Sequence, residues 1–378
     1  MTVEVQSVVA AIFVSCVGGL LLIWAGYPLL ILSVARLLPR RLPPPPSAGK
    51  PASVSLIIAS REGRADIAAR VEDILRHRHA EQPLEIIVAL DPGGGARPGD
   101  FGPVDRGVIY VRGDEPGGKA TTLNAGVRAA SGEILAFTDT FQRFDESTIR
   151  RLSEALEDHR LGAVSGALHL PAAGRAGELL RVYWGLERAL RAAEARIHSS
   201  VGVTGAVCAV RRQAWTPLPA GLILDDLYIP MRLVLDGWRI GFEPRAVAHD
   251  TRPPAPEPEY SRKTRTLTGV LQLCVWLPGV LSLRKNPIWF QFIGHKLSRF
   301  ATPFLVAGAV VSGLAIVESW LGAWRFLALL LVASLLIGIP GRPGAVLRGA
   351  IRLGLILQWA TLAALWNAGR SRWGVWTR

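Results

Sequence analysis

The sequence predicts an α/β domain with a mostly parallel sheet flanked by helices, placed between membrane-spanning helices. Three observations predict this fold. Residues 7–35 contain no charged side chain, residues 52–265 combine short apolar runs with frequent charges, and long uncharged stretches return after residue 265. The first run is longer than the roughly 20 residues that cross a bilayer as a helix.

Composition agrees with a partly membrane-embedded protein. Of the 378 residues, 50% are hydrophobic and 19% are charged, which excludes disorder as the main state. The formal net charge of +13 fits either a nucleic-acid binder or a membrane protein. Because many Lys and Arg residues stand beside the apolar runs, we favour membrane lipids as a partner and expect no nucleic acid. Three cysteines are too few for a disulfide scaffold.

The N-terminal part predicts a transmembrane helix with a basic flank over residues 1–41. Arg36, Arg40 and Arg41 follow the apolar run, and residues 42–51 form a Pro-rich linker. By the positive-inside rule, the following domain, residues 52–265, is expected in the cytoplasm.

Strand and helix signals alternate in the central domain. We expect strands at 54–59, 84–90, 108–111 and 134–138, and helices at 67–76, 122–130 and 145–158. Continuous apolar strands separated by helices indicate a parallel sheet covered on both faces. Asp91 and Asp139 follow two of these strands. Ligands bind at the carboxyl ends of such strands, although Asp is also an ordinary turn residue there.

The C-terminal part returns to the membrane. Residues 266–299 predict interfacial amphipathic helices, with Trp276, Trp289 and Phe290 at headgroup depth; a further transmembrane helix is the alternative. Residues 300–369 contain candidate spans at 300–317, 326–341 and 353–369, followed by a tail at 370–378. Three spans would place the arginines of this tail outside, against the positive-inside rule.

Three charged motifs suggest chemistry. Gly118-Lys119 stands before a helix, where the glycine lets the main chain approach a phosphate and the lysine supplies a positive charge; a simple turn is the alternative. The adjacent carboxylates of Asp225 and Asp226 suit a general base, because the proximity of like charges raises one of the two pKa values; a helix N-cap is the alternative. Residues 262–265 could clamp a pyrophosphate or form a basic membrane flank. We interpret His249 as structural.

Taken in order, these segments resemble the membrane-bound family-2 glycosyltransferases of the exopolysaccharide type, which are related to cellulose and hyaluronan synthases. The resemblance spans nearly the whole chain and implies a GT-A fold. It rests on the segments Val54–Arg61, Ile86–Asp91, Gly118–Gly126, Phe137–Asp139, Thr204–Ala206, Asp225-Asp226, Arg262–Thr266 and Val375–Arg378.

The resemblance implies roles for particular residues. Asp226 is expected to be the catalytic base, with Asp225 beside it, and Asp139 is expected to bind Mg²⁺ or Mn²⁺. The expected donor-binding and nucleotide-binding residues are Ser60, Arg61, Glu62, Asp91, Gly118, Lys119, Asn124, Asp139, Arg262 and Arg265. The expected acceptor-binding residues are Thr204, Gly205 and Ala206. The implied donor is a nucleotide-diphosphate sugar, with UDP favoured and GDP as the main competitor.

The chain departs from the family pattern at three places. Asp139-Thr140-Phe141 lacks the second Asp of the D-x-D motif, Glu62-Gly63 replaces Asn-Glu, and Arg262–Thr266 lacks the Gln and Trp of Q-x-x-R-W. Losing the last motif weakens the case for processive synthesis. We therefore expect an inverting enzyme of the bacterial inner membrane that adds one sugar to a polyprenyl-linked glycan. A processive polysaccharide synthase and a catalytically inactive nucleotide-sugar sensor or assembly protein are the alternatives.

Overall fold

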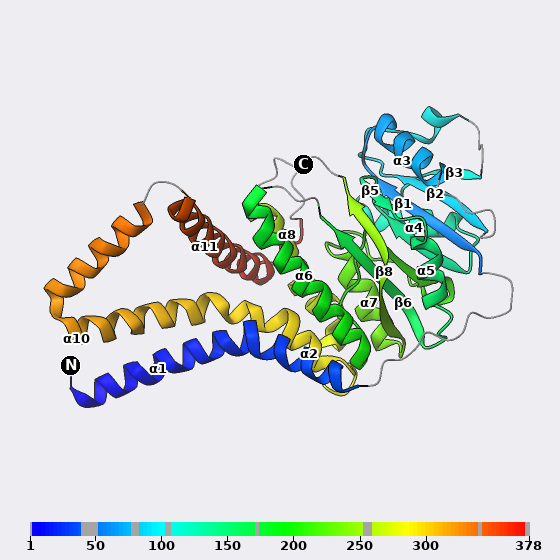
Figure 1. Ribbon diagram of the computed structural model, residues 1–378. Helices are drawn as coiled ribbons and strands as arrows, with labels where there is room; N and C mark the ends of the chain where they lie inside the picture. The colour runs from blue at the N-terminus through cyan, green and yellow to red at the C-terminus, as the bar shows by residue number, and fades with distance from the viewer. Residues whose placement is uncertain are drawn as a thin grey trace.

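An α/β domain lies at one end of a group of long helices (Figure 1). The computed structural model describes residues 2–38, 52–76, 83–102, 107–170, 174–251, 259–338 and 342–374. The expected linker at 42–51 and the motif at 375–378 lie outside these residues. In Figure 1 the N-terminal helix and the first part of α10 run side by side away from the domain.

Eight strands form one mixed sheet in the order β3-β2-β1-β4-β7-β6-β8-β5. The first four strands of this order include all the predicted ones and pair in parallel: Val108–Arg112 (β3), Leu84–Leu90 (β2), Val54–Ser60 (β1) and Ile134–Thr138 (β4). The other four are Cys208–Arg211 (β7), Leu161–His169 (β6), Arg239–Asp250 (β8) and Gln142–Phe144 (β5). β7 is antiparallel to both its neighbours, and β5 is antiparallel to β8.

The central strands are buried on both faces, as their continuous apolar runs predict. Ile57 of β1 belongs to one hydrophobic core, while Leu56 and Ile58 belong to the other. Successive strand side chains point to opposite faces, so a strand without polar alternation needs cover on both sides. The first core continues beyond the sheet to Leu273 and Phe292, so the interfacial segment shares a core with the catalytic domain.

The helices of the domain confirm the sequence periodicity with shifts of a few residues at their ends. They are Arg64–Arg76 (α3), Lys119–Ala129 (α4), Thr148–Ala155 (α5), Gly174–Ile197 (α6) and Asp225–Leu235 (α7). α4 packs on β1 and β2, and α5 packs on β8. The connections therefore place the first residue of α4 and the first residues of α7 near the carboxyl ends of the parallel strands.

Two helical segments among the described residues are long and apolar enough to cross a membrane by length and composition. One is Val3–Leu37, which joins Val3–Leu21 (α1), a π-helical turn at Leu22–Gly26 and Tyr27–Leu37 (α2). The other is Trp289–Gly322, which begins in the expected interfacial segment. That segment contains Glu259–Trp276 (α8), Trp289–Phe292 (α9) and the π-helical turn Ile293–Leu297 (η5).

The C-terminal helices return to the catalytic domain. Thr302–Gly338 (α10) contains two helical parts, because Gly322 has φ 72° and turns the chain. Arg342–Gly369 (α11) then packs along α8, and Asn367 Nδ2 lies 3.5 Å from Thr268 Oγ1 of α8. The end of α11 is therefore beside the domain (Figure 1). Arg370 and Arg372 directly follow this end of α11. Their position relative to the membrane stays a prediction.

A buried polar cluster joins α2 to the catalytic domain. His295 of η5 contacts Glu194 Oε1 through Nδ1 at 2.7 Å and Glu187 Oε2 through Nε2 at 2.9 Å. Tyr27 of α2 donates to Glu194 at 2.7 Å, and Arg299 donates to Glu187 at 2.8 Å. Burial alone would raise the pKa of both glutamates, but their bonds to His295 help to hold both values below the usual range. Buried carboxylates need such partners to remain charged.

The contact between α4 and the sheet gives a test of the fold. A Cβ on Gly126 would lie 2.8 Å from Ile57 Cγ2 in the core, whereas a Cβ on Gly185 of α6 meets no atom within 4 Å. Gly126→Val should therefore destabilise the protein by about 1–3 kcal/mol through overpacking. Gly185→Ala is the control and should leave stability unchanged or raise it by up to about 1 kcal/mol. Thermal unfolding in detergent measures both, and an unchanged melting temperature for Gly126→Val would contradict the packing.

Candidate active site

The ammonium of Lys119 joins two carboxylates that are distant in sequence. Lys119 is the first residue of α4, and its Nζ lies 3.2 Å from Asp139 Oδ1 and 3.3 Å from Asp225 Oδ2. Asp139 directly follows β4, and Asp225 begins α7. The side chains of Lys119 and Asp139 are each 28% exposed, so this triad remains open to a ligand.

The first turn of α7 contains both carboxylates of the predicted catalytic pair. A helix N-terminus carries a partial positive charge, which favours acidic side chains at this position. The Asp226 carbonyl accepts a hydrogen bond of 2.9 Å from Val203 N, which ties α7 to the loop before β7. Asp225 is thereby directed at Lys119, while Asp226 lines the adjacent cavity.

The charges of this group influence one another. Burial and the neighbouring Asp225 raise the pKa of Asp226 above the ordinary aspartate range, and Lys119 and Arg191 oppose part of that rise. Burial alone would lower the pKa of Lys119, but Asp139, Asp225 and Asp226 together raise it. Lys119 therefore stays an ammonium at neutral pH, and Asp226 has the elevated basicity that suits a proton acceptor.

The predicted acceptor loop borders this group. A Cβ on Gly205 would lie 3.4 Å from Lys119 Nζ, 3.5 Å from Asp226 Cβ and 3.7 Å from Asp225 Oδ2. The glycine thus allows the main chain to approach the charged triad closely. Thr204 Oγ1 accepts a hydrogen bond from Arg191 Nη1 at 3.0 Å, and Ala206 is buried.

Asp91 organises the predicted nucleotide loops. Its buried carboxylate accepts hydrogen bonds from Gly93 N at 2.8 Å and from Gly118 N at 2.6 Å, and Arg61 Nε lies 3.5 Å away. Gly118 has φ 97°, which glycine adopts without the strain that a side chain would cause. Asp91 therefore holds the turn that places Lys119 at the start of α4, and a role in contacting the nucleotide stays a prediction.

Other predicted donor residues also make contacts within the protein. Ser60 Oγ accepts a bond from Glu62 N at 3.1 Å and shapes the loop after β1. Asn124 Nδ2 donates a hydrogen bond to the carbonyl of Leu218 at 2.8 Å, and Asn124 Oδ1 accepts one from Leu218 N at 2.9 Å. Asn124 thus fixes the loop before α7, and its assignment to the donor site stays a prediction.

One cavity of about 440 Å³ contains the catalytic pair. Its walls come from the catalytic domain and from the apolar helices, including Trp24 of the N-terminal helix and Leu357 and Thr361 of α11. The predicted residues Arg262 and Arg265 also line it. Seven cationic side chains face three carboxylates; the cations are Lys119, Arg191, Arg262, Lys263, Arg265, Lys296 and Arg299. The excess of positive charge suits an anionic ligand.

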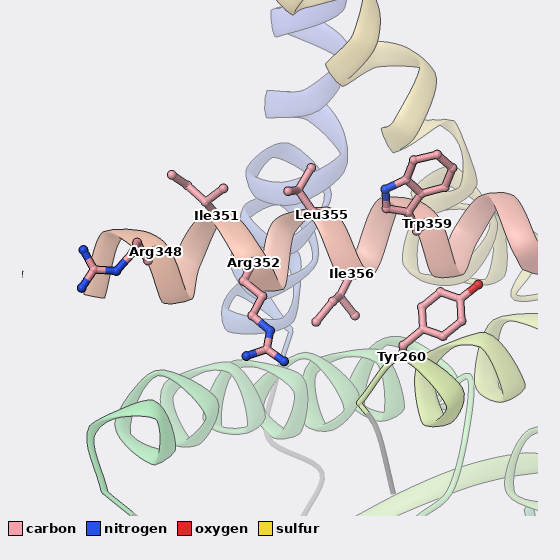
Figure 2. Close-up of a pocket in the computed structure, with 7 residues that line it drawn as sticks. All are labelled: Tyr260, Arg348, Ile351, Arg352, Leu355, Ile356 and Trp359. Carbon is pink, nitrogen blue, oxygen red and sulfur yellow. The ribbon is translucent and has the colours of Figure 1, made fainter. Parts of the chain in front are cut away.

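A second cleft of about 580 Å³ lies along α11 (Figure 2). Its lining is mostly apolar and comes from α11 and from Tyr260 near the start of α8, with two arginines among the side chains. In Figure 2 Arg352 points from α11 towards the helices opposite, whereas Arg348 points along α11 away from Trp359. Both cavities are lined by residues of α8 and α11. On α11 they are adjacent, because Ile356 lines this cleft and Leu357 lines the cavity that contains Asp226.

Two carboxylates near Lys119 are the candidate ligands of a divalent cation. No group of three or more His, Cys, Asp or Glu side chains that could hold a metal occurs in the described ranges. Asp139 and Asp225 lie 3.2 Å and 3.3 Å from Lys119 Nζ, so a cation held by both carboxylates would take the place of this ammonium. Mg²⁺ is commonly held by one or two carboxylates together with phosphate oxygens and water. His249 is outside this group and pairs with Asp145 at 3.0 Å, as its structural interpretation predicts.

Comparison with known proteins identifies the family. Residues 51–269, more than half of the chain, match the family described as glycosyltransferase like family 2. The chain belongs to this family. It is therefore a glycosyltransferase, and the carboxylates and Lys119 lie in its catalytic domain. This membership favours an enzyme over the alternative of an inactive sensor.

One solved structure supports the fold of this family-2 glycosyltransferase. The mannosyltransferase PcManGT from Pyrobaculum calidifontis, solved in complex with GDP-Man and Mn²⁺, is 19% identical with a TM-score of 0.70; the match covers 96% of this chain and 98% of that one. A mycobacterial protein is 17% identical with a TM-score of 0.41, covering 59% and 74%. No curated protein matched the sequence. The first match confirms the GT-A-like α/β fold.

Several cavity residues were not anticipated from the sequence of this glycosyltransferase. Arg191 and Glu187 lie in α6, and Lys296 and Arg299 lie in the turns before α10. Arg70, buried in α3, donates to Thr138 Oγ1 at 3.1 Å and supports the strand that leads to Asp139. The only sequence signal was the appearance of charges within otherwise apolar or amphipathic segments.

The pKa of Asp226 leads to a prediction for the pH profile. If Asp226 accepts a proton, kcat/KM falls as the pH drops through its raised pKa, because only the carboxylate form is active. Lys119→Met removes a charge that lowers this pKa, so the acid limb of the profile, where kcat/KM falls at low pH, should move to higher pH. Asp225→Asn removes a charge that raises it, so the limb should move to lower pH.

Arg128→Met is the control, because Arg128 is exposed at the other end of α4 and pairs with Asp114. Its pH profile should match that of the unmodified enzyme. Profiles of residual sugar transfer measured between pH 5 and pH 9 provide the comparison, and identical limbs for Lys119→Met and Asp225→Asn would contradict the role of Asp226.

Proposed function

We propose that this enzyme is an inverting glycosyltransferase that moves one sugar from a nucleotide-diphosphate donor to a polyprenyl-linked glycan in polysaccharide biosynthesis. One observation supports the membrane acceptor most directly. The cavity that contains Asp226 is walled by the catalytic domain on one side and by residues of apolar helices, such as Trp24 and Thr302, on the other. A lipid-linked acceptor can thus reach the base without leaving the membrane surface.

The adjoining cleft supports the same acceptor. Its apolar side chains on α11 suit a polyprenyl chain, and Trp359 and Tyr260 are the residue types that favour the membrane interface (Figure 2). The cleft and the catalytic cavity follow one another along α8 and α11. We therefore assign the cleft to the lipid portion and the cavity to the sugar portion of the acceptor.

The proposed reaction is a single displacement. The acceptor hydroxyl oxygen attacks the anomeric carbon, the bond from that carbon to the diphosphate oxygen breaks, and the electron pair leaves with the diphosphate. Asp226 takes the hydroxyl proton as the new bond forms. Lys119 and Arg265 stabilise the negative charge on the departing diphosphate. Because only one displacement occurs, the configuration at the anomeric carbon inverts.

Asp139, with Asp225 beside it, would hold the divalent cation, which we propose to be Mg²⁺ or Mn²⁺. Such an ion neutralises charge on the leaving diphosphate. UDP-sugar remains our proposed donor from the family resemblance, and GDP-sugar is the competitor that the Pyrobaculum mannosyltransferase binds. Ser60, Arg61, Glu62, Asp91, Gly118, Asn124 and Arg262 are proposed to form or support the donor site.

We place the enzyme in the bacterial inner membrane with residues 52–265 on the cytoplasmic side, where nucleotide sugars are made. Two apolar helical segments and the arginine that ends the first of them, Arg36, support this orientation. Residues 266–299 would lie at the interface, and residues 300–369 would return the chain through the membrane to the domain.

Donor binding can be measured by thermal shift. A matching nucleoside diphosphate at about 100 times its Kd should raise the melting temperature by roughly 5–10 °C. The shift should appear with Mg²⁺ or Mn²⁺ and shrink strongly in EDTA or in Asp139→Asn. A control variant, Arg128→Met, should retain the full shift. A shift that does not depend on metal or on Asp139 would contradict the proposed cation site.

Transfer can be followed with radiolabelled UDP-sugars and GDP-sugars and membrane lipid extract. One sugar should enter the lipid fraction, and Asp226→Asn should lower kcat at least about 100-fold while leaving donor binding intact. Full activity in Asp226→Asn would exclude Asp226 as the base. A long ladder of products on a gel would instead indicate the processive alternative.

A further inference from the structure

Three cations line the acceptor end of the catalytic cavity beyond the charges already assigned to the donor. Arg191 of α6 is bound to Thr204 in the acceptor loop, while Lys296 and Arg299 come from the turns before α10. Arg299 lies 5.1 Å from the ring of Trp24 in the N-terminal helix. These three residues, which we call the acceptor cations, therefore lie between the acceptor loop and the apolar helices.

Lys296 and Arg191 are incompletely paired within the described part of the chain, whereas Arg299 forms an ion pair with Glu187 at 2.8 Å. Lys296 has no ion pair or hydrogen bond within the described part of the chain, although its side chain lines the cavity. The buried Nε of Arg191 has no hydrogen-bond partner. Buried or half-buried cationic groups are costly unless an anion completes the site.

The acceptor cations share their cavity with the proposed base. Arg191, Lys296 and Arg299 line the same cavity as Asp226. A cavity of about 440 Å³ has the volume of a small-ligand site, so the base and the cations would contact the same short part of the acceptor.

We infer that Arg191, Lys296 and Arg299 form an anion subsite, and that the acceptor carries a negative group close to the sugar hydroxyl that reacts. This inference rests on the proposed transfer to a membrane glycan and specifies its acceptor. The anion is either the diphosphate of a lipid bearing a single sugar or a carboxylate on the accepting sugar. A long neutral glycan, with its diphosphate several sugars away, would not satisfy the subsite.

The test measures acceptor binding without turnover. The full-length protein in dodecyl maltoside is titrated with three lipids of equal chain length: polyprenyl-diphosphate glucose, polyprenyl glucoside and polyprenyl glucuronoside. At least one of the two anionic lipids should bind about tenfold or more tightly than the neutral glucoside, because charge-assisted hydrogen bonds are lost with the anion. Preference for the first assigns the anion to the diphosphate, and preference for the third assigns it to the sugar. Equal binding of all three lipids would overturn the inference.

Variants assign the preference to the subsite. Lys296→Ala should remove most of the discrimination between anionic and neutral lipids, and Lys296→Arg should restore it. Lys285→Ala is the matched control, because this exposed lysine lies in the same segment outside the cavity, and it should bind as the unmodified protein does. Melting temperatures confirm that each variant is folded. A folded Lys296→Ala protein with undiminished preference would overturn the inference.

The two proposals fail separately. If no donor yields transfer to any of the lipids but the anionic preference persists and depends on Lys296, the proposed function fails while the anion subsite stands. If transfer proceeds equally well to the neutral glucoside and binding shows no preference, the proposed function stands and the subsite fails.

Discussion

The attraction between Lys119 and two distant carboxylates is the interaction on which the active site depends. Three separate elements, the start of α4, the end of β4 and the start of α7, contribute one charge each. Without the ammonium, Asp139, Asp225 and Asp226 would repel one another in a partly buried cavity. Lys119 thus permits the carboxylates to lie close together, as the proposed cation binding and proton transfer require.

The surrounding structure holds Lys119 in place through hydrogen bonds of the backbone. Asp91 accepts bonds from the main chain of Gly93 and Gly118, so the carboxyl end of β2 controls the turn before α4. Gly205 brings the acceptor loop to the other side of the triad. A residue predicted to contact the nucleotide therefore also positions the cation that would neutralise the leaving group.

A second group of charges connects the N-terminal apolar helix to the loop beside the active site. Tyr27 binds Glu194, whose other oxygen lies 3.3 Å from Val201 N, and Val203 N in the same loop binds the carbonyl of Asp226. A continuous path of hydrogen bonds and short backbone segments thus connects the N-terminal helix to the first turn of α7.

Local structure follows from the pattern of neighbouring residues. Strands β1 to β4, helices α3 to α5 and the apolar segments follow from hydrophobic periodicity, which is a property of neighbouring residues. The positions of Asp91 and Asp139 at strand ends follow from the same local pattern, whereas the catalytic role of Asp225-Asp226 stays a prediction.

Contacts between residues that are far apart in the sequence depend on the tertiary packing. The antiparallel insertion of β7, the return of α11 to α8, and the placement of Arg191, Lys296 and Arg299 in the cavity depend on contacts between segments separated by dozens of residues or more. No local periodicity encodes such contacts, because they arise from the packing of whole elements. Part of the excess positive charge seen in the composition therefore lies in the cavity, beside Asp226, the proposed base.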